Sequence, residues 1–307
     1  MKKALVIVHF YYPEQTDVIL DLLKNIFMEY DLYCTISNKQ EYANISEKIL
    51  KFKKDANIIE TANVGYDVWP FVHIINMVDL DNYKYIIKLH TKRDIECKDF
   101  CAIGNGFLLG PGSHWRDCLF SFIANKDNFR KCINALEKPD VGMCARFNLI
   151  HGMPNHVGVI NYAKEKYPNY VCGLVDFSFV AGTMFVAKAA PFQILKNMNI
   201  SEDLFEKPKQ NHETQFAHVI ERTIGEIIYK SGMEIVDPFT PKEYVRKQVE
   251  HYKNIKHIKR LINYVVFPIF MPKYRRIFRR KLQAIFCMGP IIKDKNYFRK
   301  TSQTNTD

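Results

Sequence analysis

Residues 62–94 read ANVGYDVWPFVHIINMVDLDNYKYIIKLHTKRD, and this stretch decides the fold. An Asn-x-Gly-x-Asp turn leads into an apolar helical segment, and an apolar strand follows that ends on His90, Thr91 and Lys92. A helix followed directly by a strand is typical of a βαβ unit. Because ligands bind at the carboxyl ends of strands in such sheets, the basic strand end predicts a site for an anionic ligand.

The same alternation reaches back to the N-terminus. Apolar β-rich runs predict strands over 4–12, 31–37, 56–63 and 83–91. Helical spacing of apolar residues predicts helices over 16–30, 44–55 and 69–79. Strands separated by helices of about 10–15 residues favour an α/β fold with a Rossmann-like, mostly parallel sheet flanked by helices.

The second half of the body is less regular. The pattern breaks over residues 95–115, which are predicted to be a mobile connecting loop. We then expect a helix over 115–138, a strand over 140–146, and a strand, small-residue turn, strand and helix over 175–198. A long helix over 211–232 is predicted to end at Gly232, where a glycine cap is expected.

Composition limits the class of protein. The 307 residues are 47% hydrophobic, which supplies a proper core, and the eight cysteines include no CxxC pair. Buried free thiols in a reducing compartment are therefore expected, in place of disulfides or a zinc site. The net charge of +11 is concentrated between residues 251 and 300, where fourteen Lys or Arg accompany a single acid, Asp294.

This charge distribution separates a body, residues 1–245, from a basic amphipathic helical tail, residues 246–307. The tail interleaves Lys and Arg with large apolar residues, which suits an anionic membrane surface. No nucleic-acid-binding motif accompanies it, so no nucleic acid is expected as a partner. No apolar stretch is long enough to span a bilayer. We expect a cytoplasmic protein, peripheral on the inner face of the cell membrane, and a tail docked on the body stays open as an alternative.

Polar residues gather where the predicted strands end. They lie at the carboxyl ends of the strands predicted over 4–12, 31–37, 56–63 and 83–91, which meet at one edge of a parallel sheet. They are His9, Tyr11, Tyr12, Thr35, Asn63, Gly65, Asp67, His90, Thr91 and Lys92.

The end of the strand over 83–91 replaces acids with cations. Many α/β sugar transferases carry Asp-x-Asp at this position, where the carboxylates hold a metal against a leaving diphosphate. Here His90 and Lys92 flank Thr91, so fixed cations take that place and no metal or other cofactor is expected. A solvated charge cluster that caps the strand is the structural alternative.

Carboxylates supply the other candidate chemistry. Asp67 is predicted to accept hydrogen bonds from sugar or ribose hydroxyls or to act as a base, and the alternative is a helix N-cap. His218 shares a helix face with Glu221 and Arg222, and Glu213 lies near the start of that helix. A carboxylate there can deprotonate a hydroxyl while His or Arg meets phosphates, and the alternative is an exposed, salt-bridged face.

Six pieces of the chain, taken in order, resemble the rhamnan synthesis protein F family of bacterial glycosyltransferases. They are HFYYP (9–13), NVGYDVWPF (63–71), YIIKLHTKRD (85–94), HWRDCL (114–119), AGTMFVAKAAPF (181–192) and HVIER (218–222). The resemblance implies a GT-A-like fold and assembly of cell-surface polysaccharide or lipopolysaccharide. The sequence departs from the expected pattern at Ala187 and Lys188, where we expect an arginine or an aromatic residue.

The resemblance also implies a reaction. A hexosyltransferase of rhamnosyltransferase type would move a sugar from dTDP-rhamnose, or another dTDP- or UDP-sugar, to a lipid-linked or growing glycan acceptor. Tyr11 or Tyr12 would contact the nucleobase, and Glu221, Glu213 or Asp67 would be the base. The residues that carry over are His9, Asn63, Gly65, Asp67, His90, Lys92, Trp115, Arg116, Gly182 with the adjoining Thr183, His218, Glu221 and Arg222. A non-catalytic membrane-associated scaffold and a metal-dependent nucleotidyl- or phosphoryl-transferring enzyme are the alternatives.

Overall fold

The computed structural model describes residues 3–37, 39–93, 101–103, 107–109, 115–152, 157–170, 177–208 and 215–243. The chain divides into two compact units. The first consists of Met1–Arg93 and Cys118–Phe239, and the second of Asp94–Asp117 and Thr240–Asp307. The predicted tail, residues 246–307, lies outside the described residues.

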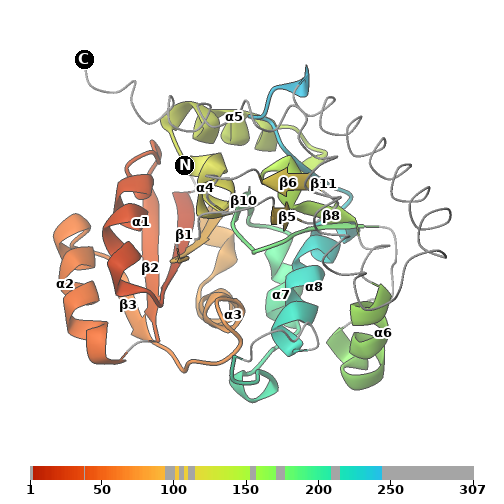
Figure 1. Cartoon of the computed structure of the whole chain (residues 1–307), viewed down its shortest axis with the longest axis horizontal. Helices are drawn as coiled ribbons and strands as arrows, with labels where there is room; N and C mark the ends of the chain where they lie inside the picture. The colour runs from red at the N-terminus through yellow and green to blue at the C-terminus, as the bar shows by residue number, and fades with distance from the viewer. Residues whose placement is uncertain are drawn as a thin grey trace, which may run out of the picture. The chain divides into compact units, whose positions relative to one another are not determined.

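A seven-stranded sheet forms the core of the first unit, in the order β11-β7-β10-β4-β1-β2-β3 (Figure 1). All neighbouring pairs are parallel except those of β10, which runs antiparallel to both β4 and β7. The predicted mostly parallel sheet is therefore confirmed. The strands are β1 Lys3–Phe10, β2 Tyr30–Ile36, β3 Asn57–Glu60, β4 Tyr83–His90, β7 Val141–Cys144, β10 Phe185–Lys188 and β11 Glu234–Val236.

Helices flank the sheet. Helices α3, α7 and α8 contact one another, and α3 contacts β1, so the three share one face of the sheet. Phe27, in the segment after α1, contacts Phe129 of α5 at a ring separation of 5.5 Å, so this segment packs against α5. The helices are α1 Thr16–Leu23, α2 Tyr42–Phe52, α3 Val68–Met77, α4 Trp115–Phe120, α5 Lys126–Leu136, α6 Val157–Lys166, α7 Phe192–Asn197 and α8 Phe216–Lys230.

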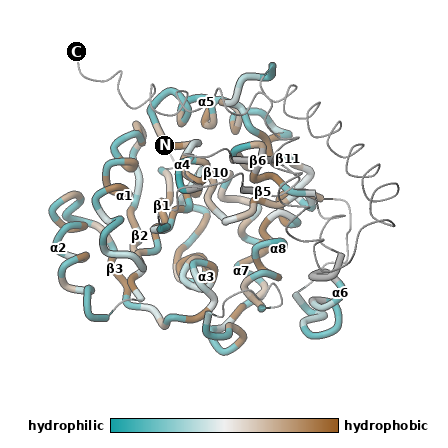
Figure 2. Tube along the Cα trace, viewed as in Figure 1, coloured by the Kyte–Doolittle hydropathy of each residue, from teal (hydrophilic) through white to brown (hydrophobic). Residues whose placement is uncertain are grey.

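The central strands are apolar because helices cover them on both faces. Residues 4–8 of β1 are almost completely buried, as are Ile86, Ile87 and Leu89 of β4. Continuous Val, Ile and Leu runs are typical of strands in parallel sheets. Figure 2 shows hydrophilic residues on the outward side of α2. None of the helices within the described residues is long and apolar enough to cross a membrane.

Two predicted helices were too long. The helix expected over 16–30 ends at Leu23, because Tyr30 pairs with Ala4 in the sheet and Glu29 accepts a backbone hydrogen bond from Ala4 at 3.0 Å. The helix expected over 115–138 breaks at Asn125, which has extended backbone and whose side chain accepts from the Asn128 amide at 2.8 Å. A new N-cap therefore starts α5.

Smaller elements were also missed. The segment predicted as a loop over 95–115 contains a hairpin of β5 (Cys101–Ile103) and β6 (Phe107–Leu109) in the second unit. β8 (Ile150–Gly152) pairs with β9 (Ser178–Val180), and neither β8 nor β11 has an apolar run long enough to stand out in the sequence. The predicted cap at Gly232 is confirmed, with φ of 70° and a bond from its amide to Tyr229.

Candidate active site

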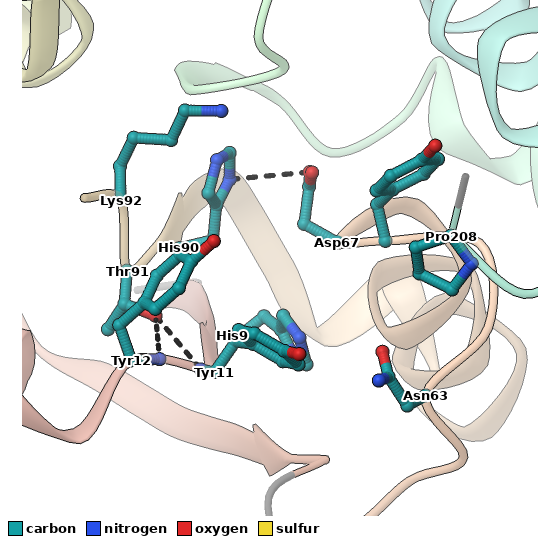
Figure 3. A pocket seen from close by; sticks show the side chains of 10 residues that line it. His9, Tyr11, Tyr12, Asn63, Asp67, His90, Thr91, Lys92 and Pro208 are labelled. Carbon is teal, nitrogen blue, oxygen red and sulfur yellow. Dashed lines mark hydrogen bonds and ion pairs between the residues drawn. The ribbon is translucent and has the colours of Figure 1, made fainter. Parts of the chain in front are cut away.

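A pocket of about 320 Å³ lies where β1 and β4 end. Its walls come from three connections of the parallel sheet, which follow β1, β3 and β4, together with Pro208 before α8 (Figure 3). The strand-end rule predicted this edge. The lining residues are His9, Tyr11, Tyr12, Asn63, Tyr66, Asp67, His90, Thr91, Lys92 and Pro208.

A left-handed turn delivers Asp67 to the pocket. Gly65 and Tyr66 have φ values of 60° and 56°, and a Cβ on Gly65 would lie 2.3 Å from the Phe205 ring. Glycine is therefore required at position 65 by both conformation and space. Asp67 stands at the N-cap position of α3, but its side chain makes no capping bond. The alternative interpretation is therefore correct about the N-cap position of Asp67, and the carboxylate itself is bonded elsewhere.

Three side chains contact the same oxygen of the Asp67 carboxylate. Its Oδ2 accepts hydrogen bonds from the Lys88 ammonium and the Thr183 hydroxyl, and His90 Nδ1 lies 3.3 Å from the same oxygen. Lys88 also donates to Thr183 at 2.7 Å. Within the described residues, every interaction of this carboxylate is with Oδ2, which leaves Oδ1 available to a ligand in the pocket.

Burial and charge set the ionisation of these groups. Burial by itself raises the pKa of Asp67, but His90, Lys88 and Thr183 outweigh it and bring the pKa below its ordinary value. Burial lowers the pKa of His9 to about 4 and holds the pKa of His90 well below 6.5. At neutral pH the pocket therefore contains an ionised carboxylate and two neutral imidazoles.

Thr91 joins the ends of β1 and β4. Its hydroxyl oxygen accepts hydrogen bonds from the backbone amides of Tyr11 and Tyr12 at 2.9 and 3.0 Å. These two bonds occupy both lone pairs, so the hydroxyl hydrogen is left for a further acceptor. The two tyrosine rings meet edge to face at 4.9 Å, and the Arg93 guanidinium lies 5.0 Å over the Tyr12 ring. Thr91 therefore fixes the aromatic wall and can donate to a ligand.

Two further groups complete the described pocket. His9 Nδ1 lies 3.0 Å from the hydroxyl of Thr35, the strand-end residue of β2, and this contact orients the imidazole ring. Lys92 follows Thr91 and extends its ammonium group along one side of the pocket (Figure 3). Lys92 therefore brings a positive charge to the same pocket as the Thr91 hydroxyl.

The predicted motif on α8 contacts the Gly182–Thr183 turn, and Thr183 of this turn bonds to Asp67. Glu221 Oε1 accepts from the Gly182 amide at 2.9 Å, and Oε2 pairs with Arg222 at 2.6 Å. Arg222 also donates to the His218 carbonyl at 3.0 Å, and the His218 ring lies 5.7 Å from Tyr66. Arg222 is buried, so the alternative of an exposed salt-bridged face is wrong. None of these three motif residues is among the described residues that line the pocket.

The other predicted residues are distributed as follows. Gly182 lies in the turn between β9 and β10, and Thr183 beside it reaches Asp67. Arg116 lies on α4 in the second unit, 3.8 Å from Asp117. Glu213 lies outside the described residues. The predicted free thiols are found at the cysteines that the structure describes in full, which are buried: Cys34, Cys118, Cys132 and Cys144.

Sequence reasoning missed Lys88, Tyr66, Pro208 and Gln215. Gln215 accepts from the Tyr66 hydroxyl at 2.5 Å and donates to the Lys207 carbonyl at 2.8 Å, so it ties two parts of the pocket wall together. Lys88 did carry a signal, because it interrupts an apolar strand that is buried on both faces. Among the described residues, no group of three or more His, Cys, Asp or Glu side chains is arranged to hold a metal ion.

Comparison with known proteins identifies the family. Two similar curated proteins are uncharacterized WxcX proteins of Xanthomonas campestris pv. campestris, 22% identical in strain B100 and 21% in strain ATCC 33913, each over 237 residues. These alignments cover 76% of this chain and 32% of each relative, so the match spans about a third of the relatives' length. The model of the family described as rhamnan synthesis protein F matches residues 1–233. The chain therefore belongs to the rhamnan synthesis protein F family, which links it to the synthesis of polysaccharide.

Proposed function

We propose that this protein is a glycosyltransferase that moves a sugar from a nucleotide-activated donor to a cell-surface polysaccharide. The donor is dTDP-rhamnose or another dTDP- or UDP-sugar, and the acceptor is a growing or lipid-linked glycan. One observation carries the proposal. A single pocket at the carboxyl ends of β1 and β4 combines an ionised carboxylate, a donating hydroxyl, an ammonium group and two tyrosine rings.

Each of these groups matches a part of a nucleotide sugar. Lys92 and the Thr91 hydroxyl suit the diphosphate, because cations and fixed donors stabilise the charge that develops on a leaving phosphate. Tyr11 or Tyr12 offers a ring for the nucleobase. The free Oδ1 of Asp67 accepts a hydrogen bond from a sugar or ribose hydroxyl. In this scheme the Lys92 ammonium and the Thr91 hydroxyl act without a metal held on carboxylates, and His90 contributes as a neutral imidazole.

The pocket also bears on the catalytic base. A base is most effective when its pKa lies near the working pH, and the pKa of Asp67 lies below its ordinary value. Asp67 is therefore better suited to binding a hydroxyl than to removing its proton. Glu221 has both oxygens engaged. Glu213, the third predicted base, lies outside the described residues and stays a prediction.

The test is a transfer assay with UDP-, dTDP- and GDP-sugars, together with calorimetry of donor binding in the presence and absence of EDTA. Lys92→Ala is expected to weaken donor binding at least tenfold, because it removes a cation from the diphosphate. Lys48→Ala is the matched control, since Lys48 is a half-exposed lysine on α2 that pairs with Asp17 and does not line the pocket.

The outcomes separate the alternatives. Binding that persists in EDTA and weakens in Lys92→Ala alone supports a donor site built on the fixed Lys92 cation. Binding that disappears in EDTA would favour a metal-dependent nucleotidyl- or phosphoryl-transferring enzyme. Absence of binding to any nucleotide sugar would contradict the proposal and favour a scaffold of a polysaccharide assembly complex.

The membrane association predicted from residues 246–307 is part of the same proposal, because a lipid-linked acceptor lies at a membrane surface. The full chain is expected to float with vesicles that contain anionic lipid, and a chain truncated after residue 245 is expected to lose that binding. Equal flotation of the two chains would exclude a membrane role for the tail.

A further inference from the structure

The turn that carries Thr183 has an unfavourable backbone. The bond from the Thr183 amide to the Val180 carbonyl, at 3.2 Å, closes the turn between β9 and β10. Gly182 and Thr183 both have positive φ values, 79° and 49°. A β-branched residue rarely adopts the left-handed region, so contacts outside the turn must hold Thr183 there.

Glu221 supplies one such contact. Its Oε1 accepts the Gly182 amide hydrogen at 2.9 Å, and an ionised acceptor makes this a stronger bond than one between neutral groups. The carboxylate is itself fixed, because Oε2 pairs with Arg222 at 2.6 Å. Arg222 in turn donates to the His218 carbonyl and lies 4.8 Å over the Phe179 ring. Helix α8 therefore holds the turn through one carboxylate.

Thr183 transmits this restraint to the pocket. Its buried hydroxyl donates to Asp67 Oδ2 and accepts from Lys88. A shift of the turn would move the hydroxyl away from Asp67 and release one of the groups that direct Oδ1 toward the pocket. The connection from Glu221 to Asp67 runs through consecutive hydrogen-bonded residues, Gly182 and Thr183.

We infer that Glu221 is a positioning residue for Asp67, acting through the Gly182–Thr183 turn, and is not the base that deprotonates the acceptor. This inference rests on the proposed function in one respect: it takes Asp67 to be a residue that binds the sugar donor. Both oxygens of Glu221 are engaged, and Glu221 is not among the described residues that line the pocket. A base needs a free oxygen within reach of the substrate.

Two substitutions separate positioning from proton transfer. Glu221→Gln keeps a carbonyl oxygen for the Gly182 amide, so we expect kcat/KM to stay within about fivefold of the native value. Glu221→Ala leaves the Gly182 amide without its acceptor, so we expect at least a tenfold rise in donor KM with an unchanged pH-rate profile. Glu137→Ala, which removes a carboxylate bonded to Lys84 and Tyr85, is the control and should leave activity unchanged.

The opposite pattern would overturn the inference. If Glu221 is the base, Glu221→Gln will lower kcat at least a hundredfold, as severely as Glu221→Ala, and will remove one limb of the pH-rate profile. A double-mutant cycle with Thr183→Val adds a second criterion. In the Thr183→Val background Glu221→Ala should cost less than about twofold, because the path is already broken. Additive losses would contradict a connection through Thr183.

A readout that needs no turnover keeps this test separate from that of the proposed function. Amide hydrogen exchange at Gly182 should rise at least tenfold in Glu221→Ala and stay near native in Glu221→Gln. The carboxyl ¹³C resonance of Asp67 should shift in Glu221→Ala and stay in place in Glu137→Ala. Unchanged exchange at Gly182 or an unchanged Asp67 resonance in Glu221→Ala would contradict the inference, whether or not the protein transfers a sugar.

Discussion

Strand β4 carries two lysine–carboxylate pairs, and they lie in opposite environments. Near its start, Lys84 lies 2.6 Å from Glu137, and the two side chains are 47% and 54% exposed. Near its end, Lys88 pairs with Asp67, and the exposures are 1% and 19%. The residue types are alike, and the difference is the burial.

Burial changes what a pair can do. An exposed pair is screened by water and typically contributes up to about 1 kcal/mol. The hydration lost by a buried pair can cost more than its attraction returns, and apolar residues often replace such a pair without loss of stability. The Lys88–Asp67 pair is therefore better explained by the carboxylate that it presents to the pocket than by stability.

The largest expected effect is that of breaking the buried pair. Asp67→Ala leaves the Lys88 ammonium buried without its counterion, so the free energy of unfolding should fall by about 3–5 kcal/mol. Urea denaturation followed by circular dichroism measures this change. A loss below about 1 kcal/mol would mean that water reaches Lys88 and that the two pairs are equivalent.

A double substitution sharpens the same comparison. Replacing both partners, Asp67→Leu with Lys88→Met, should recover most of the stability lost in Asp67→Ala, because no buried charge remains. The double variant should still fail to bind nucleotide sugars in calorimetry. Binding restored together with stability would contradict a role for the carboxylate in the pocket.

Mild acid should lower the free energy of unfolding through the histidines of the pocket. Burial lowers the pKa of His9 from 6.5 to about 4, so between these values the unfolded chain binds a proton that the folded chain does not. The free energy of unfolding should therefore fall as the pH falls from about 6.5 to about 4, by up to about 3 kcal/mol from His9.

Urea denaturation at a series of pH values measures this slope. His9→Gln should flatten it, and the native slope should be unchanged in Glu137→Ala. His90 acts in the same direction, because burial also lowers its pKa, so a residual slope is expected in His9→Gln. Equal slopes in the native protein and His9→Gln would show that His9 is hydrated in the folded chain.

The smallest expected effect is that of breaking the exposed pair. Glu137→Ala should reduce the free energy of unfolding by less than about 1 kcal/mol, and the difference should shrink further in high salt because ions screen exposed charges. The measurement is urea denaturation at low and high ionic strength. A loss as large as that of Asp67→Ala would remove the contrast between the two pairs.

The location of the pocket could be predicted from the sequence. Alternating apolar strands and helices indicate a parallel sheet, and the carboxyl ends of such strands meet at one edge, so His9, Asp67 and His90 were expected together. The structure places them around one pocket. Their roles in binding and catalysis stay predictions.

The environment behind Asp67 could not be predicted in the same way. Thr183 lies in the turn before the antiparallel strand β10. The position of β10 beside β4 depends on the order of the strands in the sheet, and strand order leaves no local signal in the sequence. Residue spacing indicates that Glu221 shares a helix face with His218 and Arg222, and this pattern resembles a catalytic carboxylate. The spacing gives no sign of the Gly182 amide, which is hydrogen-bonded to the Glu221 carboxylate in the structure. The length of α1 was misjudged because pairing of Tyr30 in the sheet outweighs helical spacing.

The residues that hold Asp67 are far from it along the chain, with Lys88 at 21 positions and Thr183 at 116 positions. Contacts of long sequence separation carry a large loop-closure entropy and tend to form late in folding. During synthesis, the parallel strands β1 to β4 emerge long before β10. A nascent chain that ends before Thr183 therefore has the strand ends of the pocket but lacks one of the three side chains that hold the Asp67 carboxylate.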